Sequence, residues 1–118
     1  MDRGALGRAG EEAAARFLVR DGWTLLDRNA RVRAGELDLV LERDGVLAFV
    51  EVKARRTHRA GSPAEAVDER RAGRVARAAA EYLARKGLPE APRTFLVAAV
   101  EMDGEGRAVR VGILPMNG

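Results

Sequence analysis

The alternation of apolar and polar positions predicts seven secondary-structure elements. Apolar residues at helical spacing predict one helix over about 4–21 and a longer one over about 62–86. Short apolar or alternating runs predict strands over 23–32, 36–42, 46–55, 94–101 and 108–114. The expected order is therefore α-β-β-β-α-β-β. A long helix between two groups of strands is typical of an α/β domain with a mixed central sheet flanked by helices.

Local signals define two of the boundaries. Ser62, Pro63 and Glu65 have the pattern of a capping box with proline at the first helical position, so they predict the start of the second helix. Asp44-Gly45 separates two apolar runs and predicts a two-residue hairpin turn.

The helical periodicity also predicts which side chains face inward. In the first helix Glu11 lies at the edge of the apolar stripe, whereas Glu12 faces away from it. In the second helix Arg71 lies near the middle of the stripe, where it would pair with a carboxylate or bind a phosphate. The stripe of the first helix is Leu6, Ala9, Ala13, Ala14, Phe17 and Leu18, and that of the second is Val67, Val75, Ala78, Tyr82 and Leu83.

The predicted turn fixes the pairing between strands 36–42 and 46–55. Leu37, Leu39 and Leu41 would oppose Val52, Val50 and Ala48 on one wholly apolar face. On the other face Asp38 would oppose Glu51, and Lys53 would lie one diagonal step from Asp38.

Two directly opposed carboxylates destabilise a sheet unless something neutralises them. A divalent cation, Mg²⁺ or Mn²⁺, held by Asp38 and Glu51 would do so, and Lys53 would then hold an attacking water nearby. These are the parts needed for attack on a phosphodiester. The simpler alternative is that Glu51 and Lys53 form an ordinary ion pair at the end of a strand.

Composition and charge narrow the class of protein. The chain has 118 residues, 47% of them hydrophobic, which suits one globular domain over 1–118. It has no cysteine and no run of about 20 apolar residues, so we expect a cytoplasmic protein without a membrane span. Ten basic and four acidic residues give residues 53–86 a net charge of +6. Such a segment indicates an anionic partner or a well-solvated helix face.

Several linked motifs point to a known family. Gly35-Glu36-Leu37-Asp38 is followed by a hairpin and by Phe49-Val50-Glu51-Val52-Lys53-Ala54-Arg55. Gly7-Arg8-Ala9-Gly10-Glu11 precedes them, and Gly61-Ser62-Pro63 with Glu65-Ala66-Val67 follows. This arrangement resembles the PD-(D/E)XK nuclease superfamily and, more closely, the YraN-like bacterial family within it.

The resemblance implies a restriction-endonuclease-like fold and a metal-dependent endonuclease. It implies metal ligation by Asp38 and Glu51, a role for Lys53 near the attacking water, and Glu11 as a further acidic catalytic residue. Two positions depart from the family pattern: Arg71 stands where a Lys is usual, and Leu96 stands where an Asp is expected.

Three functions remain open from the sequence. The first is an endonuclease acting on DNA, with branched or damaged DNA as candidate substrates, and as a homodimer if both strands are cut. The second is a nucleic-acid-binding module of the same fold without efficient cleavage, and the third is an adaptor whose acidic cluster binds metal only for stability. For either of the first two, the expected nucleic-acid contacts are Arg55, Arg56, Arg59 and Arg71.

Overall fold

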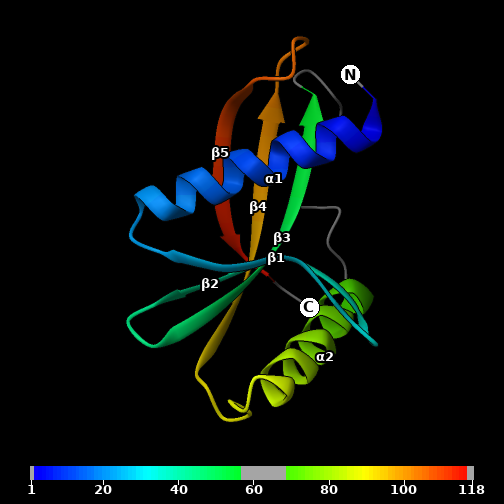
Figure 1. Cartoon of the computed structure of the whole chain (residues 1–118). Coiled ribbons are helices and arrows are strands. Elements are labelled where there is room, and N and C mark those ends of the chain that lie inside the picture. Colours follow the sequence, from blue (N-terminus) through cyan, green and yellow to red (C-terminus); the bar gives the residue numbers. More distant parts are fainter. Residues whose placement is uncertain (1, 57–68, 117–118) are drawn as a thin grey trace.

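The predicted order of elements is confirmed by a computed structural model, which describes residues 2–56 and 69–116 (Figure 1). The first three strands follow one another directly, and the second helix separates them from the last two. The elements are α1 (Arg3–Arg20), β1 (Thr24–Val32), β2 (Gly35–Arg43), β3 (Val46–Arg56), α2 (Glu69–Arg85), β4 (Arg93–Met102) and β5 (Ala108–Pro115).

The five strands form one mixed sheet in the order β1-β2-β3-β4-β5. β3 and β4 are parallel because α2 carries the chain back between them, whereas every other neighbouring pair is antiparallel. Figure 1 shows α1 lying across β3, β4 and β5, with α2 at the other end of the molecule. The sheet therefore buries one face under each helix.

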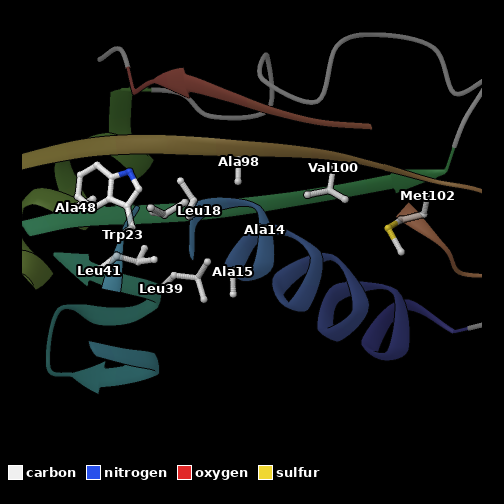
Figure 2. Close-up of a cluster of buried hydrophobic side chains, with 11 residues drawn as sticks. Ala14, Ala15, Leu18, Trp23, Leu39, Leu41, Ala48, Ala98, Val100 and Met102 are labelled. Atoms are coloured by element: carbon white, nitrogen blue, oxygen red, sulfur yellow. The ribbon is translucent and has the colours of Figure 1, made fainter. Parts of the chain in front are cut away.

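Each helix covers its own hydrophobic cluster. Under α1, Ala14, Ala15 and Leu18 pack with Trp23 and with side chains of β2, β3 and β4, as Figure 2 shows. Under α2, the buried side chains are Val32, Leu37, Val40, Leu47, Phe49, Val75, Ala78, Ala79, Tyr82 and Leu83. The stripe predicted for the second helix is thus confirmed at every position that the structure describes, while Val67 lies outside the described residues, as do Ser62, Pro63 and Glu65.

Two predicted core positions are wrong. Phe17 is 42% exposed, because the buried face of α1 runs instead through Gly10, Ala14, Ala15 and Leu18. Leu37 does not share a face with Leu39: it packs in the cluster under α2, whereas Leu39 packs under α1. The hydrogen-bonded pairing of β2 with β3 ends at Leu39, so the β2–β3 register no longer fixes which face Leu37 takes.

Neither helix in the described part of the chain is long and apolar enough to cross a membrane.

Candidate active site

The β2–β3 hairpin has the predicted turn and register over most of its length. Asp44 and Gly45 both have positive φ values, 53° and 81°, as a type I′ turn requires. The pairing of Leu41 with Ala48 and of Leu39 with Val50 follows from this turn and is confirmed. Beyond Leu39 and Val50, however, no further cross-strand pair joins β2 to β3 in the described residues. The predicted pairing of Asp38 with Glu51, and of Leu37 with Val52, is therefore wrong.

Asp38 occupies the point where the two strands separate. Its Oδ2 accepts a hydrogen bond of 2.8 Å from the backbone N–H of Val52. The carboxylate thus takes an amide of β3 that a continuing ladder would have joined to the backbone of β2. Asp38 is thereby anchored, and the two strands open beside it.

The opening contains a cavity of about 290 Å³. It is lined on the sheet side by Gly35, Glu36, Asp38 and Glu51, and on the α2 side by Arg74, Val75 and Ala78. The two carboxylates that the register argument brought together therefore face one solvent-accessible space, and Glu36 joins them there.

Glu11 reaches this region because α1 lies unusually close to β3. Gly10 is buried, and a Cβ atom placed on it would lie only 2.5 Å from the Cβ of Ala54. Glycine therefore permits an approach that alanine would block. The next residue, Glu11, comes close enough to Asp38 for their charges to interact.

Asn29 connects Glu11 on α1 to Glu36 at the start of β2. Its φ of 52° lies in the left-handed region, which asparagine tolerates better than most residues. With its amide nitrogen turned toward the carboxylates, it donates hydrogen bonds of 3.2 Å to Glu11 Oε1 and 3.2 Å to Glu36 Oε1. Asn29 therefore holds one acidic side chain from α1 and one from β2 at the edge of the cavity.

The carboxylates of this cluster resist ionisation. Burial raises the pKa of Asp38, and repulsion from Glu36 adds to the effect, whereas the Val52 amide opposes it. Burial and repulsion from Asp38 likewise raise the pKa values of Glu51 and Glu11. The site therefore holds more negative charge than its surroundings stabilise, which is the electrostatic condition that a bound cation relieves.

Two basic side chains adjoin Glu51. Arg71 Nη1 lies 3.7 Å from Glu51 Oε1, an ion-pair distance that is too long for a hydrogen bond. Burial lowers the pKa of Lys53, and the positive charges of Arg71 and Arg55 lower it further. The ammonium group thus gives up a proton more readily than an exposed lysine does, even though Glu51 and Asp38 oppose this.

Residues 10–100 match the sequence profile described as "Uncharacterised protein family UPF0102". The chain belongs to the UPF0102 family. The YraN-like resemblance is thereby confirmed, since both names denote one family.

UPF0102 proteins of several bacteria are similar over most of their length. One from Symbiobacterium thermophilum is 49% identical over 86% of this chain and 86% of its own. One from Myxococcus xanthus is 41% identical over 97% of this chain and 89% of its own. A crystal structure of an Anabaena variabilis protein, described as an FdxN element excision controlling factor, aligns with 93% of this chain and 99% of that chain, with 15% identity and a TM-score of 0.39.

The structure adds three residues that sequence reasoning did not place in the site: Asn29, Glu36 and Arg74. Arg74 follows Arg71 by three positions and therefore lies on the same side of α2, a spacing that would have indicated it. Its side chain packs over Gly35, where an added Cβ would meet Arg74 Cδ at 3.5 Å. No comparable local signal marked Asn29, whose role depends on a backbone conformation.

Other predicted residues of this UPF0102 protein lie around or beyond the cavity. Arg55 and Arg56 follow Lys53 at the end of β3, whereas Arg59 lies outside the described residues. Glu12 pairs with Arg16 and Arg28 on the surface, as predicted. Leu96 pairs with Val50 in the parallel register and packs under α1, on the face opposite Glu51.

The donor set of the cavity fits a small divalent cation with few protein ligands. Within residues 2–56 and 69–116, no group of three or more Asp, Glu or His side chains is close enough together to hold an ion. Asp38 and Glu51 are two carboxylates that line the cavity, and Mg²⁺ commonly takes one or two carboxylates and keeps several waters. The raised pKa values of both side chains agree with such a site.

Proposed function

We propose that this chain is a Mg²⁺- or Mn²⁺-dependent endonuclease that hydrolyses DNA phosphodiester bonds. The observation that carries the proposal is the cavity between the separating strands. Asp38 and Glu51 both line it, and Lys53 follows two residues later on β3. Carboxylates with raised pKa values beside arginine and lysine side chains are the groups needed to bind a cation and a phosphate together.

Each residue has a distinct role in this proposal. Asp38 and Glu51 hold the cation, which neutralises negative charge on the phosphate when it is bound. Lys53 orients the attacking water, and its lowered pKa suits a group that exchanges a proton during the reaction. Glu11 acts from α1 as a further acidic group whose position depends on Asn29.

The charge distribution supports a nucleic-acid substrate. Residues 53–86 carry a net charge of +6, and Arg74 from this segment lines the acidic cavity. Arg55 and Arg56 extend from the end of β3, and Arg71 and Arg74 flank Glu51 from α2. We assign phosphate contacts to Arg55, Arg56, Arg71 and Arg59. Branched or damaged DNA, a homodimer and a cytoplasmic location stay predictions from the sequence.

One observation favours the alternative, a nucleic-acid-binding module without efficient cleavage. Arg71 lies 3.7 Å from Glu51 and so neutralises part of its charge without a metal ion. If this ion pair persisted with DNA bound, Glu51 would be a weaker ligand for the cation.

Cleavage assays separate the two functions. The protein is incubated with Mg²⁺ or Mn²⁺ and a panel of linear, nicked, flapped and four-way DNA, beside a Lys53→Ala variant. The endonuclease proposal predicts cleavage of at least one substrate by the parent and none by the variant. DNA binding without cleavage of any substrate would favour the binding module, and equal cleavage by both proteins would refute the role of Lys53.

A further inference from the structure

A second, larger cavity lies next to the candidate active site along β3. It measures about 700 Å³ and lies between the start of α1 and the end of β3. Figure 1 shows these two segments side by side, with the tip of β3 next to the N-terminal end of α1. Its described lining residues are Asp2, Arg3, Leu6, Lys53, Ala54, Arg55 and Arg56.

The lining is strongly basic. Arg3, Lys53, Arg55 and Arg56 are the cations, and Asp2 is the one acidic residue among the described lining. The Asp2 carboxylate is already engaged, because its Oδ1 accepts a 2.7 Å hydrogen bond from the Ala5 backbone N–H. It caps α1 and therefore competes little for the basic side chains. The cavity is thus set up for an anion.

Arg55 supplies a second, independent sign of a missing acceptor. Its Nε atom is buried and has no hydrogen-bond partner in the described part of the chain. Buried side-chain donors without a partner are uncommon in folded proteins, and phosphate oxygens are acceptors that a guanidinium group binds well. Arg55 also lines this cavity, so its guanidinium group keeps hydrogen-bonding capacity that the described residues leave unused.

The position of the cavity identifies which anion fits. Lys53 lines it, and Glu51, two residues earlier on β3, lines the carboxylate cavity. From Glu51 to Arg55 the strand rises about 13 Å, which equals the rise of about four nucleotides in one strand of B-DNA. None of the described lining residues is aromatic, so stacking of bases is not favoured.

We propose that this second cavity binds the sugar-phosphate backbone of the cleaved strand, about four nucleotides to one side of the scissile phosphate. The inference rests on the proposed function and deepens it, because it adds Arg3 on α1 to the phosphate contact already assigned to Arg55 and gives both a place relative to the scissile phosphate. Recognition there is independent of base sequence, and it fixes on which side of the cleavage position the substrate must continue.

The test measures DNA binding apart from cleavage. A fluorescein-labelled DNA duplex is titrated in Ca²⁺, and Kd is determined by anisotropy over a range of salt concentrations. Arg3→Ala and Arg55→Ala should each weaken binding and reduce the slope of log Kd against log salt by about 0.9, one phosphate contact. Arg16→Ala is the matched control, because Arg16 lies on the same helix but its side chain is 71% exposed and pairs with Glu12. It should keep the parent slope.

Truncated DNA adds a positional test. Shortening the duplex from one end to within about four nucleotides of the cleavage position should weaken binding to the parent. The Arg3→Ala variant should lose less affinity on that truncation than the parent does. If Arg3→Ala and Arg55→Ala both keep the parent's salt slope and the parent's loss of affinity on truncation, this inference is overturned and the endonuclease proposal still stands. No DNA binding by the parent would overturn both.

Discussion

Replacing either of two glycines of α1 by alanine should change the stability of the protein, but in opposite directions. Gly10→Ala adds a methyl group that would lie 2.5 Å from the Cβ of Ala54, whereas Gly7→Ala adds one with no atom within 4 Å. Both positions lie inside the helix Arg3–Arg20, so both variants gain the same intrinsic helix propensity. The difference between them therefore isolates the contact between α1 and β3.

The size of the stability loss expected for Gly10→Ala follows from the distance between the two Cβ atoms. Carbon atoms pack best at about 3.5–4.0 Å, so α1 must retreat from β3 by about 1 Å to accept alanine at position 10. Overpacking of this kind costs about 1–3 kcal/mol, and we expect the upper end because neither Cβ atom can rotate away. The gain in propensity offsets about 1 kcal/mol. Gly10→Ala should thus lose about 2 kcal/mol and about 8 °C in Tm.

The matched variant, Gly7→Ala, should be more stable than the parent. Gly7→Ala should gain about 0.5–1 kcal/mol, a rise in Tm of about 2–4 °C. Thermal unfolding followed by circular dichroism measures both variants. The double variant Gly10→Ala with Ala54→Gly removes the clashing methyl group, so it should be more stable than Gly10→Ala alone.

The same shift should reach the candidate active site. Glu11 follows Gly10 directly, and a displacement of about 1 Å in a catalytic group can cost about 100-fold in rate. Cleavage by Gly10→Ala should therefore fall well below that of Gly7→Ala at a temperature where both are folded. A Tm for Gly10→Ala at or above that of the parent would refute the close-approach argument, as would failure of Ala54→Gly to restore any stability.

Three further predictions concern the carboxylate cavity. Asp38→Asn should raise the Tm of the metal-free protein at neutral pH. The raised pKa of Asp38 means that its ionisation opposes folding, so its contribution to stability is present at low pH and lost as the pH rises through the folded-state pKa. The Tm difference between variant and parent should accordingly grow from pH 4 toward pH 7, and a constant difference would contradict this reasoning. Glu51→Gln should bind Mn²⁺ much more weakly than the parent in calorimetric titration, and equal binding would exclude Glu51 as a ligand. Lys53→Arg should cleave no better than Lys53→Ala, because a guanidinium group keeps its proton; activity near that of the parent would show that charge alone is required.

Much of the candidate site could be predicted because it depends on residues close together in the sequence. Asp44-Gly45 sets the hairpin turn, the turn sets the register, and alternation along β3 places Glu51 and Lys53 on one side. The helical periodicity correctly distinguished Glu11 from Glu12. These rules involve only nearest neighbours along a strand or around a helix, so no knowledge of the whole fold is needed to apply them.

The tertiary structure decided the rest. The separation of β2 from β3 beyond Leu39 and the burial of Leu37 under α2 depend on how the sheet packs between the two helices. The arrival of Glu11 at Asp38 depends on a contact between Gly10 and Ala54, 44 residues apart in sequence. The sequence by itself therefore determined which chemical groups the strands and helices present. Only packing between distant segments decided where α1 and α2 cross the sheet, and with it which of those groups meet in one cavity.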